Sequence, residues 1–226
     1  MFERVPVSML GWDRVTDADD RRHLVPAEVA AVVAVAIVSV AGAWPDRIPV
    51  VLPLFAAASV FRWWRGRPWG EVWHAAPGYP LIACGVGVAA LLLGVVAGTP
   101  VIEALSDRAV QWSTFPLVRG SVSNLVVVAI LVTAIAVAAE LVFHGWLVER
   151  VLELSPKNVA IAVMLGGAAE ALVMPGDFAS RLGAGLFGTG LGWMYVASGR
   201  TVAATIPARI VFSVGAVVLE SLRVIG

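Results

Sequence analysis

The run from Ser121 to Val148 constrains the fold most, because it is long and almost entirely apolar. A helix needs about 20 apolar residues to cross the roughly 30 Å hydrocarbon core of a bilayer. The run therefore predicts a membrane-spanning helix. Its second half carries a carboxylate, Glu140, and an imidazole, His144. Four residues apart on a helix, these two side chains lie on the same face, one turn apart.

The composition extends this prediction to the whole chain. Hydrophobic residues make up 59% of the sequence and charged residues only 14%, against about 25% charged residues in an average soluble domain. We therefore expect an all-α, polytopic bundle of about seven transmembrane helices, with a range of six to eight. The apolar runs place these spans at about 26–43, 47–61, 79–97, 121–148, 156–174, 178–197 and 201–222.

The segments outside the spans differ in charge. Residues 1–25 hold nine charged side chains and predict a cytoplasmic tail rather than a signal peptide. Residues 26–222 are expected to form a single transmembrane domain. From Arg62 to His74, four tryptophans next to three arginines predict an interfacial loop that faces lipid headgroups. Residues 98–119 predict a loop or a surface-lying amphipathic helix, and Pro207 and Arg209 are expected to interrupt the last span.

The charged residues also predict the orientation of the chain in the membrane and limit the classes of partner. With the N-terminus inside, ten basic residues fall on the cytoplasmic side and five outside, as the positive-inside rule favours. One lysine against fifteen arginines, with abundant alanine and valine, favours a bacterial plasma membrane. The net charge of zero argues against a nucleic-acid partner, which leaves the lipid bilayer as the expected surrounding. The single cysteine, Cys84, excludes an internal disulfide and a cysteine metal cluster.

Four ionisable side chains fall inside predicted spans: Glu140, His144, Glu170 and Arg209. A charged residue at mid-membrane costs about 2.5–3.5 kcal/mol on insertion scales, so each should have a partner. One interpretation is that Arg209 pairs with Glu140 or Glu170 and holds helices together. The other is a reaction or transport site. Glu170 could complete a metal site, but no further histidine lies in a predicted span, so we expect no metal and no cofactor.

The segment Glu140-Leu-Val-Phe-His144-Gly145-Trp-Leu resembles the first motif of the CPBP family of intramembrane proteases, also called the Abi or CAAX-protease family. In that family the motif is two glutamates, three residues and Arg-Gly. The stretch from Gly185 to Ala204 is similar to the family's penultimate helix, turn and last helix. The resemblance covers about residues 120–220. It implies a CPBP-like core and a glutamate endopeptidase in which a Glu and a His activate water.

The sequence departs from the family at the positions that carry this chemistry. The first glutamate falls on Ala139, and the motif's arginine falls on His144. The second motif, Phe-x-x-x-His, falls on Glu170–Met174 without its histidine. The third, His-x-x-x-Asn or His-x-x-x-Asp, falls near Ala208–Phe212 or Arg209–Ser213, again without a histidine.

These departures lead to three functional hypotheses. Removing one member of a catalytic unit costs several orders of magnitude in rate. The leading hypothesis is therefore a catalytically impaired relative, a pseudoprotease, that binds a membrane protein or peptide. The first alternative is an active intramembrane peptidase with Glu140 as base and His144 as its helper. The second is a small transporter component built on the polar centre of Glu140, Glu170 and Arg209.

Overall fold

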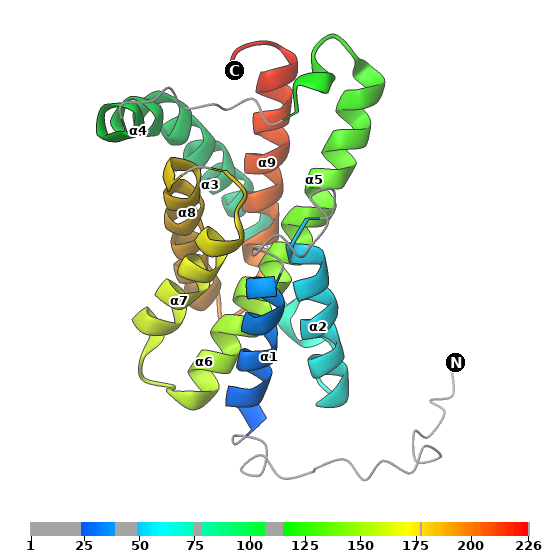
Figure 1. Ribbon diagram of the computed structural model, residues 1–226, viewed down its shortest axis with the longest axis vertical. Coiled ribbons are helices and arrows are strands. Elements are labelled where there is room, and N and C mark those ends of the chain that lie inside the picture. Colours follow the sequence, from blue (N-terminus) through cyan, green and yellow to red (C-terminus); the bar gives the residue numbers. More distant parts are fainter. Residues whose placement is uncertain (1–23, 39–48, 75–77, 107–114, 177, 226) are drawn as a thin grey trace.

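A computed structural model describes residues 24–38, 49–74, 78–106, 115–176 and 178–225. Over these ranges the chain is helical, without a strand, and the helices form an elongated bundle (Figure 1). This confirms the predicted all-α membrane bundle. The α-helices are α1 Val25–Val38, α2 Val51–Trp64, α3 Tyr79–Leu93, α4 Thr99–Ser106, α5 Val122–Val142, α6 Glu149–Leu154, α7 Val159–Val173, α8 Phe178–Ala197 and α9 Ile206–Ser221.

Helix length separates the spans into two groups. In the described residues, Tyr79–Val101, Val122–Leu154 and Val202–Ser221 are long and apolar enough to cross a membrane. The apolar helices α1, α2 and α7 have 14 or 15 residues, which at 1.5 Å per residue is about 21–23 Å. Helices of this length leave part of the hydrocarbon uncrossed or thin the bilayer. Helix α8 belongs to neither group, so the count of seven spans stays a prediction.

The longest helix is continuous from Val122 to Leu154 and changes its winding at the residues of interest. Ser121 caps its start by accepting a hydrogen bond from the Asn124 N–H. From Phe143 to Val148 the backbone is π-helical, a rare winding that frequently marks functional sites. The helix then continues as α6, so the predicted end at Val148 was wrong by six residues.

Glycines let α7 and α8 approach closely. A Cβ built on Gly167 of α7 would collide with Thr189 and with the Gly185 carbonyl of α8. A Cβ on Gly188 of α8 would collide with the Glu170 carboxylate. Small residues are the usual means of close helix packing in membranes. Here they also leave room for Glu170 between the two helices.

The interfacial loop predicted for Arg62–His74 was wrong in its first part. Helix α2 continues to Trp64, and the Arg62 side chain is only 3% exposed. Its guanidinium donates to the carbonyls of Gly145, at 3.1 Å, and Pro68, at 3.0 Å. Trp63 is 76% exposed and points outward. Arginine turns inward here because carbonyl acceptors lie inside the bundle.

The predicted interruption of the last span was wrong at Arg209, whereas just before Pro207 the winding does change: a 3-10 helix over Val202–Ala204 precedes α9, which begins at Ile206. Pro207 lies in the first turn of α9, where its missing N–H breaks no helical hydrogen bond. The helix then runs uninterrupted through Arg209 to Ser221. In the segment 98–119, α4 is a helix and Pro116–Val118 is a 3-10 turn. Residues 107–114 and most of the charged tail predicted for 1–25 lie outside the described residues.

Candidate functional site: a buried polar centre

Glu140 and His144 lie on one face of the long helix and contact each other, as their spacing predicts. His144 Nδ1 is 2.8 Å from Glu140 Oε2, and both side chains are fully buried. The other ring nitrogen, Nε2, is 2.9 Å from the carbonyl oxygen of Gly188 on α8. Both nitrogens thus face acceptor oxygens. An imidazole satisfies two acceptors only when it carries both protons, so this geometry fits a cationic His144.

Arg209 of α9 joins two helices in the same centre. Its Nε donates to Glu140 Oε1. Its terminal nitrogens donate to the two oxygens of Glu170 on α7, at 2.5 and 2.6 Å. This two-pronged geometry is the strongest form of an arginine–carboxylate pair. The structure therefore brings all four sequence-predicted residues together.

The four side chains balance one another in charge. Glu140 and Glu170 supply two negative charges, and Arg209 and the doubly protonated His144 supply two positive charges. A buried charge is tolerated when it is paired and fully hydrogen-bonded. All four carboxylate oxygens have a partner in this centre. The cluster is therefore neutral as a whole, and each of its carboxylate oxygens is engaged by a positively charged group.

Aromatic rings and a glycine enclose the centre on the α8 side. The Arg209 guanidinium lies 5.5 Å from the centroid of the Phe187 ring, and the Tyr195 ring centroid is 6.2 Å from that of His144. A Cβ on Gly192 would approach the His144 ring to 3.4 Å. The sequence analysis assigned no role in the polar centre to the α8 glycines. It missed that Gly188 also presents a carbonyl oxygen to His144.

Two positions that carry catalytic groups in the family motifs lie outside the polar centre of this chain. Ala139, in the place of the first glutamate, packs in an apolar cluster with Val32 and Leu54, away from His144. Met174, in the place of the second motif's histidine, follows the end of α7 and is 41% exposed. Glu170, four residues earlier, is the α7 side chain that enters the centre. The position of the second motif's histidine therefore lies outside the polar centre.

Arg62 is a further residue of this region that sequence reasoning placed at the membrane surface. It donates to the Gly145 carbonyl, directly after His144 in the π-helical segment. A charged donor at this carbonyl steadies the backbone that carries His144. No local signal in the sequence could show it, because Arg62 and Gly145 lie 83 residues apart. Among the described residues, no three His, Cys, Asp or Glu side chains come together to hold a metal ion.

Comparison with known proteins confirms the resemblance. Residues 120–214 match the family model of the type II CAAX prenyl endopeptidases, Rce1-like. No curated protein matches the chain, and no solved structure matches it. The matched segment holds the helix that carries Glu140 and His144, together with α7, α8 and the first half of α9, and thus every member of the polar centre. In this membrane core, residues 120–214, the chain is therefore similar to the Rce1-like family of CPBP proteins.

Proposed function

We propose that the chain is a catalytically impaired Rce1-like membrane protein that binds a membrane protein or peptide without cleaving it. The observation that carries this proposal is the buried, charge-balanced cluster of Glu140, His144, Glu170 and Arg209. We also propose a bacterial plasma membrane as the location of the chain, with the N-terminus inside, because the arginine-rich composition and the distribution of basic residues favour both.

Hydrolysis needs a base that can reach a water molecule. One oxygen of Glu140 is held by Arg209 and the other by His144. A doubly protonated His144 has no lone pair to accept a proton. The neighbouring Ala139 offers only a methyl group, packed in the dry apolar cluster. These contacts argue against water activation at this centre.

Helix α8 offers a surface that suits a membrane-spanning partner. Gly183 and Gly190 have no atom within 4 Å of where a Cβ would stand. They are seven residues apart and share a helix face with the exposed side chains of Leu186 and Trp193. Glycine on an exposed transmembrane face allows a second helix to approach closely. This face supports a helical peptide as the ligand.

The first experiment tests catalysis. The full chain and its Glu140→Gln variant, reconstituted in liposomes, are incubated with a library of membrane-spanning peptides. Product analysis by mass spectrometry should show no cleavage by the wild type above the variant. Cleavage that depends on Glu140 would instead establish the peptidase alternative. The 2.8 Å contact between Glu140 and His144 is the one observation that favours that alternative.

The second experiment tests binding. The same peptide library is cross-linked to the chain in liposomes, and retained peptides are counted by mass spectrometry. Gly190→Leu should lower retention at least fivefold. Gly85→Leu on α3 is the matched control, because Gly85 also has open space at its Cβ position. Equal retention by both variants would contradict a peptide site on α8.

A further inference from the structure

The π-helical segment from Phe143 to Val148 lies between two polar contacts that attach the long helix to α8. At its start, His144 Nε2 contacts the carbonyl oxygen of Gly188 at 2.9 Å. Directly after it, Glu149 accepts a hydrogen bond from the hydroxyl of Tyr195 at 3.0 Å. Gly188 and Tyr195 are seven residues apart, two turns along one face of α8. Their partners on the long helix are only five residues apart.

Ordinary helical winding does not place two residues with this spacing on one face. An α-helix turns by about 100° per residue, so Glu149 would lie about 140° away from His144 around the helix axis. A π-helix closes its hydrogen bonds between residues five positions apart, so five residues complete roughly one turn. The π-helical winding thus returns Glu149 to the side of His144. Tyr195 contacts both residues there, because its ring centroid is 6.2 Å from that of His144.

Arg62 of α2 donates to a carbonyl inside this segment, that of Gly145, at 3.1 Å. The same guanidinium donates to the Pro68 carbonyl at 3.0 Å and lies 4.6 Å from the ring centroid of Trp69. The Trp69 indole in turn donates to the hydroxyl of Ser59 on α2, at 3.1 Å. Helix α2 and the turn that follows it therefore hold the Arg62 side chain in place, and they present it to the long helix as a fixed donor.

A donor at this carbonyl has a specific task. The hydrogen bonds of a π-helical turn are out of step with the regular α-helical ladder on either side of it. Buried backbone carbonyls nevertheless require a partner. Gly145 is buried in the middle of the segment, and Arg62 supplies a charge-assisted hydrogen bond to its carbonyl. This bond is available to the π-helical winding through tertiary packing alone.

We propose that the π-helical segment is a register device, in which one extra residue, held by Arg62, turns Glu149 onto the face of His144. The device attaches α8 to the long helix at both ends of the segment. Without the donation from Arg62, the segment relaxes towards α-helical winding and Glu149 turns away from Tyr195. The device does not depend on whether the chain binds a peptide.

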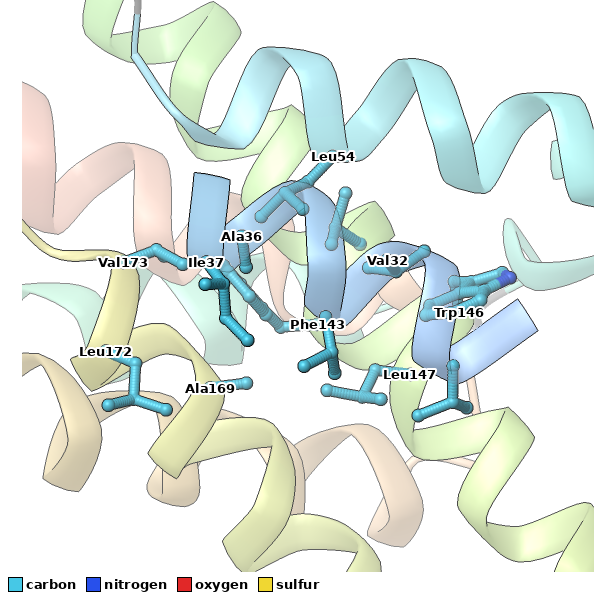
Figure 2. A pocket seen from close by; sticks show the side chains of 13 residues that line it. Val32, Ala36, Ile37, Leu54, Phe143, Trp146, Leu147, Ala169, Leu172 and Val173 are labelled. Carbon is cyan, nitrogen blue, oxygen red and sulfur yellow. The ribbon is translucent and has the colours of Figure 1, made fainter. Parts of the chain in front are cut away.

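Deleting one residue of the segment tests the device. Without Leu147 the segment should wind as an α-helix while Glu149 stays beside Tyr195, because one residue fewer compensates for the tighter turn. Leu147 is the member of the segment that is not fully buried, and it lines an apolar groove together with residues of α1 and α7 (Figure 2). The matched control is deletion of Ile130, which is 66% exposed in the α-helical part of the same helix. There, deletion turns the two flanking parts by about 100° relative to each other.

The chain has two tyrosines, Tyr79 and Tyr195, which give a direct readout. In NMR spectra of the full chain in mild detergent, with ¹³C-labelled tyrosine, the Cζ signal reports the hydrogen bond of the hydroxyl group. Tyr79→Phe assigns the two signals, and Glu149→Gln shows where the Tyr195 signal lies without its carboxylate acceptor. Deletion of Leu147 should leave the Tyr195 signal near its wild-type position. It should also lower the thermal midpoint by less than half as much as deletion of Ile130.

The role of Arg62 is tested with the same signal. Arg62→Gln should move the Tyr195 signal at least halfway to its position in Glu149→Gln. In the chain that lacks Leu147, the same substitution should leave the signal in place, because α-helical winding needs no external donor. A merely structural role of Arg62 would give equal shifts in both chains. Arg67→Gln is the control for charge, because Arg67 is 45% exposed, and it should not move the signal.

Three results would overturn the proposal. One is a Tyr195 signal at the Glu149→Gln position after deletion of Leu147. Another is an equal loss of thermal midpoint in the two deletion variants. The third is an unmoved signal in folded Arg62→Gln, and this measurement decides if neither deletion variant folds. Arg62→Lys, which keeps the charge but not the two-carbonyl fork, replaces Arg62→Gln if that variant does not fold, and it should shift the signal in the same direction.

Discussion

Arg209 and Glu170 form a two-pronged ion pair between α9 and α7, with nitrogen–oxygen distances of 2.5 and 2.6 Å. Because Arg209 also donates to Glu140, one guanidinium connects α9 to two other helices. Glu140 and His144 of the first motif thus lie in an ion cluster that connects three helices, whereas Ala139 and Met174, at the positions of the family's glutamate and histidine, lie outside it. Substitution of a residue in this ion cluster should therefore lower the free energy of unfolding.

Removing the guanidinium should destabilise the bundle strongly. Arg209→Gln leaves Glu140 and Glu170 buried with one positive partner, His144. Breaking a buried ion pair by removing one partner costs about 3–5 kcal/mol. The free energy of unfolding in mild detergent, from denaturant titration, measures the loss. The exposed Arg223→Gln should change it by less than about 0.5 kcal/mol, and equal losses in the two variants would refute the role of Arg209.

Removing both partners of the pair should cost less than the sum of the single changes. In the double variant Glu170→Gln, Arg209→Gln, the remaining Glu140 and His144 still balance in charge. Residues in direct contact show coupling energies of about 0.5–3 kcal/mol in double-mutant cycles. The cycle is measured by the same unfolding titration. Additive losses would show that the two side chains are energetically independent.

Replacing a glycine of α8 by alanine should change the stability of the protein in opposite directions at a packed position and at an open position. Gly188→Ala places a Cβ against the Glu170 carboxylate and should lower the thermal midpoint of the protein in detergent. Gly190→Ala, two residues away, meets no atom within 4 Å. It should raise stability by about 0.5–1 kcal/mol, since alanine is favoured over glycine inside a helix. A Gly188→Ala midpoint at or above the wild type would contradict the tight packing at Glu170.

Restoring the glutamate pair alone should not restore catalysis. Ala139→Glu places a carboxylate in the apolar cluster around Val32 and Leu54. An uncompensated buried charge costs about 3–5 kcal/mol. We expect a lower free energy of unfolding and no peptide cleavage. Ala139→Gln, of nearly the same size, is the control that isolates the charge, and cleavage by Ala139→Glu would contradict our assignment of this position.

Much of the fold could be predicted from local features. The length of the apolar runs predicts the helices, because a bilayer leaves a helical backbone few alternatives. The four-residue spacing predicts that Glu140 meets His144, since a helix places such residues on one face. Helix ends were less predictable. The long helix continues past Val148 because its next turns find partners in the bundle: Arg150 with Glu153, and Glu149 with Tyr195.

The inward turn of Arg62 could not be predicted in the same way. An arginine next to exposed tryptophans is typical of the membrane surface. Its acceptor, the Gly145 carbonyl, becomes available only where the packed helix takes up π-helical winding. The same holds for Glu28, whose partner Arg65 lies 37 residues away.

The sequence by itself determined an all-α membrane bundle, the shared face of Glu140 and His144, and an alanine, Ala139, next to the motif's one glutamate. These depend on apolar length and on helical spacing within one segment. Only the tertiary structure decided that Arg209 joins Glu140 and Glu170 across 69 and 39 residues, and that the centre is buried. The physical reason is that ion pairs between helices depend on how the helices pack, which no local spacing encodes.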